Sequence, residues 1–409
     1  MTTTLPVRGA HALPPGRLDW LTAELVAWQA DGLVSPGQSA AILGRYRAGR
    51  RFSLGRLLLT VGALFVGVGL IWLVAANLDA WPPLVRFVVV AALWLAALVT
   101  GEALHARRVS APVVGAVRLL AALGFGAVVS QAAQGLQVPA HEPALVGVWA
   151  LGALTHAYAA RARLPLLVGL VTGTTWLLLE VLDTEPSGLA VVLGLVAAGV
   201  LAVSVGALHL LRLPAFAPAF APAWREVGAS LLLGGLFAAA LPFVGTDGFR
   251  WTPWLAAALA AAGLAATAAA LLSPGRGRLE TLGALAVAAA ALGLVCWDAG
   301  SDADGPLTAD AVAQAAVSVV VYVAVAVALA ALGTLRDSPR LTGLATAALV
   351  VFTTFQSFAV FARIVTGAWL FLLLGVVFLA TGVLFDRARR QIAATLEPAT
   401  PGPAARSTP

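Results

Sequence analysis

Hydrophobic positions in this chain come in long runs that are separated by short polar breaks. The runs are about 18 to 25 residues long, the length that a helix needs to cross the hydrocarbon core of a membrane. They are apolar on all faces and lack the two-residue alternation of strands in a membrane barrel. The pattern predicts an all-α polytopic integral membrane protein with about twelve transmembrane helices, at 57–76, 84–104, 112–134, 144–160, 164–182, 188–211, 227–244, 252–272, 279–297, 309–335, 341–362 and 367–385.

The polar breaks between these spans alternate between basic and acidic. Every second break carries arginines: Arg45 to Arg56, Arg107 and Arg108, Arg161 and Arg163, Arg212 and Arg225, Arg276 and Arg278, Arg336 and Arg340, and Arg387 to Arg390. The breaks between them carry mostly acidic or neutral groups, such as Asp79, Glu142, Glu185, Asp247 and Asp304. Because arginine-rich loops remain in the cytoplasm, we predict an inner-membrane protein whose two termini are both cytoplasmic. Arg118, just inside the third span, is expected to extend to the cytoplasmic surface.

Only the N-terminal segment shows the amphipathic pattern of a soluble element. Leu18, Leu21, Leu25 and Trp28 recur at helical spacing, Asp31-Gly32 ends this pattern, and Ser35-Pro36 is typical of the start of a second helix. We predict four regions: a disordered leader at 1–16, a cytoplasmic helical hairpin at 17–55, the transmembrane domain at 56–386, and a disordered cytoplasmic tail at 387–409.

A hairpin this small buries little area by itself. Residues 17–50 are therefore candidates for binding a cytoplasmic protein partner or a second copy of the chain. The alternative is a linker hairpin that only packs on its own first span.

Composition supports the membrane class and gives no reason to expect a nucleic-acid partner. Hydrophobic residues make up 60% of the chain and charged residues 11%, with a mean hydropathy of +0.94. All 25 basic residues are arginine, and the net charge is +6. Since the arginines lie beside the spans in the alternating pattern, the charge is explained by membrane topology, and we expect the lipid bilayer and no nucleic acid as a partner.

The N-terminal part of the chain resembles a known family. The resemblance rests on Trp28, the run from Asp31 to Gln38, Tyr46, the glycines Gly62, Gly67 and Gly69, the turn from Asn77 to Pro82, Gln131, and the end at Arg387 to Arg390. These features are similar to a family of bacterial predicted membrane proteins known as the domain of unknown function 2157 family. Where that family tends to have aromatic residues after the Asn and the Gln, this chain has Leu78 and Ala132. The resemblance implies a bacterial multispan protein and assigns no chemistry.

Motifs for enzymatic chemistry are missing from the sequence. It contains no P-loop, no G-x-S-x-G elbow and no cluster of zinc ligands. Glu102 and His105 have the Glu-x-x-His spacing of helical di-metal sites, but no second copy exists, so we expect the two side chains to be solvated or paired with each other. We therefore predict no catalytic residue, no metal and no cofactor.

Uncharged polar residues lie mostly in the outer halves of the predicted spans. Such groups avoid lipid because an unsatisfied amide there is costly. We predict that they line a ligand-binding cavity open to the outside, formed by Gln131, Gln134, Glu180, Gln314 and Gln356. The alternative is that these positions are simply solvated at the membrane interface.

Two functions follow from these features. The first is a transporter, or a carrier of lipids or envelope precursors, with the outward-facing polar cavity. The second is a membrane sensor or scaffold that does not transport and binds a partner through the N-terminal hairpin. A third and weaker hypothesis is an intramembrane enzyme, for which His141, Glu142 and Glu180 are the only suitable donors.

Overall fold

The computed structural model describes residues 11–13, 15–48, 82–139, 142–182, 187–211, 217–241, 244–273, 275–297 and 309–361, with isolated positions between 58 and 69 and at 387. The first predicted span (57–76), the twelfth (367–385) and the C-terminal tail lie largely or wholly outside these residues. The statements below concern the described part of the chain.

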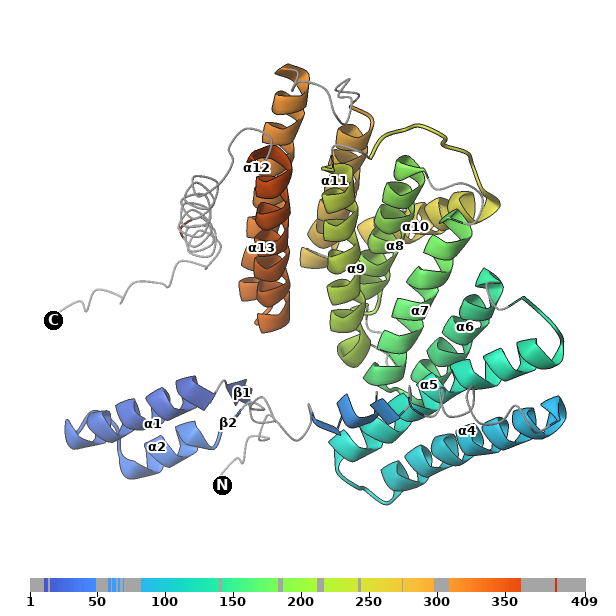
Figure 1. Ribbon diagram of the computed structural model, residues 1–409. Helices are drawn as coiled ribbons and strands as arrows, with labels where there is room; N and C mark the ends of the chain where they lie inside the picture. The colour runs from blue at the N-terminus through green and yellow to red at the C-terminus, as the bar shows by residue number, and fades with distance from the viewer. Residues whose placement is uncertain are drawn as a thin grey trace.

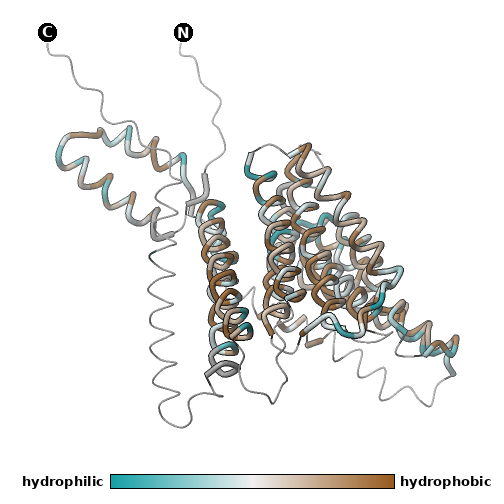
Figure 2. The backbone as a smooth tube through the Cα atoms, turned by 90° about the horizontal axis from the view of Figure 1, so that it is seen from above, coloured by the Kyte–Doolittle hydropathy of each residue, from teal (hydrophilic) through white to brown (hydrophobic). Residues whose placement is uncertain are grey.

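Long helices follow one another along the chain and fan out side by side (Figure 1). Their bounds are α4 (Pro83–Ala106), α5 (Ala111–Gly135), α6 (Pro143–Ala160), α7 (Arg163–Leu182), α8 (Gly188–Leu208), α9 (Ala217–Ala239), α10 (Pro253–Leu272), α11 (Arg276–Val295), α12 (Ala309–Leu335) and α13 (Pro339–Phe361). Hydrophobic residues run along the lengths of these helices, and hydrophilic residues gather at their ends and connections (Figure 2).

Eight of the described helices are long and apolar enough to cross a membrane. The multispan α-helical membrane class is therefore confirmed. The count of about twelve spans stays a prediction, as does the orientation of the termini.

Helix α9 differs most from the sequence prediction, which placed a span at 227–244. The helix begins at Ala217 and ends at Ala239, with Pro222 inside it. Proline normally argues against a helix interior, but Phe220 is fully buried in a cluster with Leu166 on α7. This packing stabilises the early turns, and it places Arg225 inside the helix rather than in the predicted loop.

Helix α8 lies at the centre of the main hydrophobic core and packs against α9, α10 and α11. Glycines allow α8 and α9 to approach closely. A Cβ added to Gly199 would lie 2.8 Å from Leu232, and one added to Gly228 would lie 2.8 Å from Val203. The long helices thus form one packed assembly.

The N-terminal region contains helices α1 (Pro15–Ala30) and α2 (Pro36–Leu43). Between them Gly32 has a φ of +72°, and the Ser35 side chain caps α2 in a capping box with Gln38. Two three-residue strands, β1 (His11–Leu13) and β2 (Tyr46–Ala48), pair in parallel. The division of the chain into leader, hairpin, transmembrane domain and tail stays a prediction.

Candidate functional site

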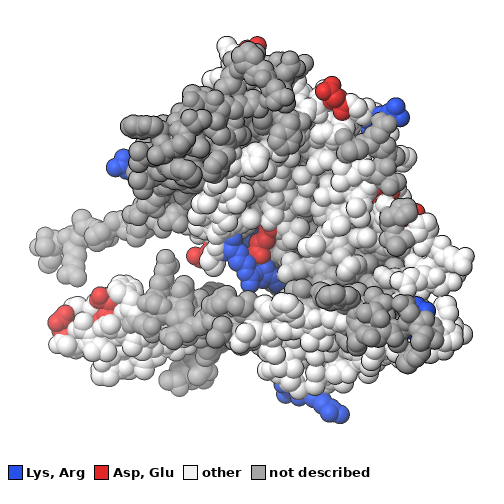
Figure 3. Space-filling model, viewed as in Figure 1, with Lys and Arg blue, Asp and Glu red and all other residues white. Residues whose placement is uncertain are grey.

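Charged side chains from several helices meet at one end of the assembly, which we call the arginine-rich end. Arg163 at the start of α7 donates to Glu226 on α9 at 2.6 Å, and Arg340 on α13 lies 3.5 Å from the same carboxylate. Figure 3 shows acidic and basic side chains side by side near the middle of an otherwise mostly uncharged face. Arginine-bearing breaks that are far apart in sequence thus lie together, as the alternation requires.

A second cluster at this end surrounds Glu280 on α11. Arg336 Nε donates to Oε1 of this carboxylate at 2.7 Å, Arg336 Nη2 forms an ion pair with the same oxygen at 2.5 Å, and Arg225 Nη1 lies 3.7 Å from Oε2. Sequence reasoning missed both Glu226 and Glu280. The sequence did contain a sign of both residues, because each is an acid close to an arginine-bearing break at the start of an apolar run. A carboxylate in that position needs a partner.

Helices α4 and α5 are joined by an ion pair between Glu102 and Arg118. Arg118 Nε donates to one carboxylate oxygen at 2.8 Å and Nη2 to the other at 2.6 Å, the strong two-pronged geometry. The Arg118 side chain is only 9% exposed, whereas that of Glu102 is 47% exposed. One expectation is therefore wrong, because Arg118 is buried rather than extended to the surface. Glu102 and His105 are both exposed, which is one of the two expected alternatives, and Glu102 pairs with Arg118 rather than with His105.

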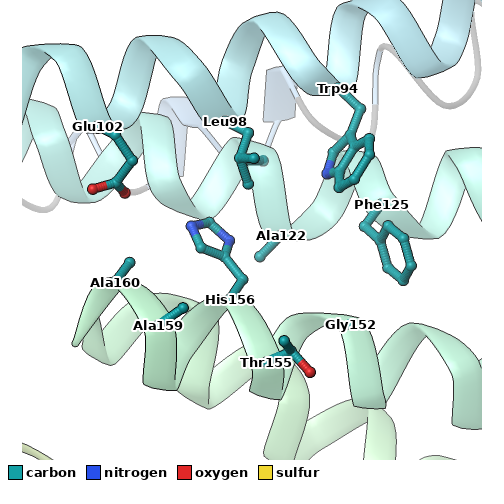
Figure 4. A pocket seen from close by; sticks show the side chains of 11 residues that line it. Trp94, Leu98, Glu102, Ala122, Phe125, Gly152, Thr155, His156, Ala159 and Ala160 are labelled. Atoms are coloured by element: carbon teal, nitrogen blue, oxygen red, sulfur yellow. The ribbon is translucent and has the colours of Figure 1, made fainter.

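A cavity of about 520 Å³ opens beside this ion pair, between α4, α5 and α6. We call it the α4–α6 cavity. Figure 4 shows Trp94 and Phe125 at one end, with Glu102 pointing down from α4 and His156 pointing up from α6 at the other. Leu98, Ala121, Ala122, Gly152 and small residues of α6 line the wall between these ends. The cavity is therefore mostly apolar along its length. Its polar part, with Glu102 and His156, faces the arginine-rich end of the helix assembly.

Close helix contacts fix the shape of this cavity. A Cβ on Gly152 would lie 2.0 Å from the Phe125 ring, so only glycine lets that ring lie against α6. The Phe125 ring packs 5.3 Å from Trp94. Across α5 and α6, Trp149 Nε1 donates to the Ala122 carbonyl at 2.8 Å, which holds the two helices in register.

His156 is the polar group of this cavity with spare bonding capacity. Its Nε2 is buried and has no hydrogen-bond partner among the described residues. Buried ring nitrogens normally have a partner, so a ligand group that enters the cavity can supply one. Within the described part of the chain, no three His, Cys, Asp or Glu side chains are grouped to hold a metal ion.

The structure places the predicted glutamines in separate local environments. Gln131 Nε2 donates to Gln134 Oε1 at 3.1 Å on α5, so these two lie together. Gln314 on α12 instead donates to the carbonyls of Leu294 and Trp297 at the end of α11. No described hydrogen bond or cavity joins these groups to one another, and their ligand-binding role stays a prediction.

Gln356 and Glu180 complete the predicted set. Gln356 on α13 is buried, and its Oε1 has no partner among the described residues. Glu180 accepts a hydrogen bond from Trp176 Nε1 at 2.9 Å and lines a second cavity of about 610 Å³, whose walls come from all five helices α6 to α10. The other lining residues of that cavity are almost all apolar, so Glu180 borders an apolar space.

Comparison with known proteins gives a family match over part of the chain and no function. Neither a curated protein nor a solved structure matches the chain. All residues that line the α4–α6 cavity lie between 94 and 160. That range falls within residues 26–166, which match the model of the family described as predicted membrane protein (DUF2157), and this match confirms the resemblance seen in the sequence.

Proposed function

We propose that the protein is a lipid-handling membrane protein, a carrier that binds the hydrocarbon part of an amphiphile in the α4–α6 cavity. The observation that carries the proposal is the shape of this cavity. Aromatic and aliphatic side chains line its length, and Glu102 and His156 lie at one end. Its volume of about 520 Å³ is within the range of ligand pockets in proteins.

The distribution of polar groups favours an amphiphile over a polar solute. A polar solute needs hydrogen-bond partners along the whole wall, because each unsatisfied group costs free energy. In this cavity polar partners are confined to Thr155 and to the Glu102 and His156 end. A ligand with an apolar body and one polar end satisfies both parts. This role requires binding and no catalysis, in line with the sequence prediction of no catalytic residue.

A sensor or scaffold role is the second candidate, supported by the N-terminal helices. Helices α1 and α2 and their connection leave large apolar side chains exposed, with Trp20, Val26 and Leu33 all more than half accessible. Such side chains are suited to contact a partner protein or a second copy. This role predicts that deletion of residues 1–50 has the same effect on the cell as loss of the whole protein, while lipid binding persists.

The carrier proposal is tested by filling the cavity. Thr155 lines it, and a tryptophan at this position would occupy the space that a hydrocarbon chain needs. Thr175 on α7 is a matched control, because it lines none of the described cavities and makes the same hydrogen bond to the carbonyl four residues earlier. Both threonines are exposed.

Binding of a fluorescent acyl-chain lipid analogue to the purified protein would be measured by anisotropy. We expect saturable binding by the wild type and a loss of about tenfold or more in affinity for Thr155→Trp, the ratio that 1.4 kcal/mol produces. Thr175→Trp is expected to bind like the wild type. Equal binding by all three proteins would refute the assignment of the α4–α6 cavity.

A further inference from the structure

A third, strongly basic cavity continues the line of the α4–α6 cavity toward the arginine-rich end. It has a volume of about 880 Å³. The charged and titratable side chains that line it are Arg108, Arg118, Arg161, Arg163, Arg340, His105 and Glu226. We call it the basic cavity.

The two cavities follow each other along the same helix faces. On α5, Val114 and Arg118 line the basic cavity, while Ala121, Ala122 and Phe125 line the α4–α6 cavity. Spacings of three, four and seven residues share one helix face. From Trp94 to His105 the two cavities together run along twelve residues of α4, and the eleven steps between them span about 16 Å at 1.5 Å per step.

The ion pair between Glu102 and Arg118 lies at the junction. Glu102 lines the α4–α6 cavity, and its partner Arg118 lines the basic cavity. A ligand that occupies both spaces therefore passes this pair, with its apolar part on the Glu102 side and its charged part on the Arg118 side.

The basic cavity carries an excess of positive charge. Its five arginines are balanced, among the described residues, by Glu226 and by Glu102 on Arg118, which leaves an excess of three. The Nε of Arg163 is buried and makes no hydrogen bond within the described part of the chain. Arginine side chains in this arrangement match the oxygens of a phosphate group.

Two of these arginines occupy backbone positions that favour glycine. Arg161 is the C-cap residue of α6 with a φ of 49°, and Arg108 directly follows the C-cap residue of α4 with a φ of 57°. A residue with a Cβ is strained in this left-handed conformation. Membrane topology needs a positive charge near the helix end, but it does not need that charge at the strained position. The two arginines therefore place their charges at this cavity from backbone positions that glycine would occupy without strain.

We infer that the basic cavity binds the phosphate headgroup of an anionic lipid whose hydrocarbon part lies in the α4–α6 cavity. This inference rests on the proposed function and adds the class of headgroup. Basic pockets between membrane helices recognise anionic headgroups by charge. Arg108, Arg161, Arg163 and Arg340 hold the phosphate, and Arg118 marks the boundary with the apolar space.

The test compares arginines inside and outside the basic cavity. Binding of phosphatidic acid and of phosphatidylcholine to delipidated protein would be measured by native mass spectrometry. We expect the wild type to prefer phosphatidic acid, and Arg108→Gln and Arg161→Gln each to weaken its binding about fivefold, as expected for one arginine at an anionic membrane surface. Arg278→Gln is the control, because Arg278 is exposed at the arginine-rich end and does not line the cavity.

A second pair of variants separates binding from folding. Glycine relieves the backbone at both positions, so Arg108→Gly and Arg161→Gly should unfold at or above the wild-type temperature and still bind phosphatidic acid weakly. Loss of binding only in variants that have also lost thermal stability would overturn the inference.

Two further outcomes also decide the question. If Thr155→Trp abolishes lipid binding while the arginine variants bind normally, the carrier proposal stands and the phosphate assignment fails. If inorganic phosphate binds the wild type as tightly as phosphatidic acid does and displaces it, the ligand is a soluble anion and the lipid assignment is overturned. We expect inorganic phosphate to bind far more weakly, because it lacks the hydrocarbon part.

Discussion

Replacing Glu280 by glutamine should destabilise the assembly of helices α9, α11 and α12. The Glu280 side chain is 5% exposed, and its partners Arg225 and Arg336 are 10% and 19% exposed. Removing one partner of a buried ion pair costs about 3 to 5 kcal/mol, because the remaining charge stays buried without compensation. Glutamine still accepts one hydrogen bond, so we expect the lower end, about 3 kcal/mol.

The expected effect depends on burial and can be compared within the same chain. The arginines that pair with Glu226, Arg163 and Arg340, are 31% and 59% exposed, so water can solvate the charges that Glu226→Gln leaves behind, and the cost should be about 1 kcal/mol. At about 2 °C per kcal/mol for a large domain, Glu280→Gln should lower the melting temperature by about 6 °C and Glu226→Gln by about 2 °C. The measurement is thermal unfolding in nanodiscs, followed by circular dichroism.

Two further variants serve as controls. One changes an exposed acid, and the other replaces Glu280 and its two arginine partners by apolar residues. Glu142→Gln changes an exposed carboxylate with no described ion pair and should leave the melting temperature nearly unchanged. The triple variant Arg225→Met, Glu280→Leu and Arg336→Met removes all three charges together and should recover most of the loss. If Glu280→Gln melts with the wild type, or if Glu226→Gln is the more damaging variant, the reasoning from burial is refuted.

Three further predictions concern topology, capping and access. Reporter fusions after Arg163 should read cytoplasmic and those after Glu142 extracytoplasmic; one inverted reading contradicts the predicted orientation. Ser35→Ala should cost about 1 kcal/mol in the stability of α2, seen as faster hydrogen exchange of that helix, because the capping bond to Gln38 is lost. A cysteine at Gln134, in a Cys296→Ser background, should react with an impermeant thiol reagent added outside, and a protected cysteine would place this residue away from the outer water.

Hydropathy predicted most helices well because a membrane span is a local property of the sequence. Helix α12 has the predicted bounds, and α5 differs from its predicted span by one residue at each end. Helix α9 was misplaced because Pro222 argues locally against a helix, whereas the burial of Phe220 is a tertiary effect. Local patterns cannot show a contact that depends on how two helices pack.

The candidate site was only partly accessible to sequence reasoning for the same reason. Glu102 was singled out, but its partner Arg118 lies sixteen positions later on the next helix. Nothing in the hydropathy pattern pairs these two residues. The two cavities likewise depend on which faces of α4, α5 and α6 meet, and hydrophobic faces on all sides leave that choice open in the sequence.

The most direct test of the central claim is to map where a photoactivatable lipid attaches to the protein. Phosphatidic acid with a diazirine in its acyl chain would be cross-linked in membranes, and the adducts located by mass spectrometry. The account predicts adducts concentrated on Leu98, Ala122 and their neighbours around the α4–α6 cavity, and their loss in Thr155→Trp but not in Thr175→Trp. Adducts spread evenly over the apolar helices, and unchanged in Thr155→Trp, would contradict the account.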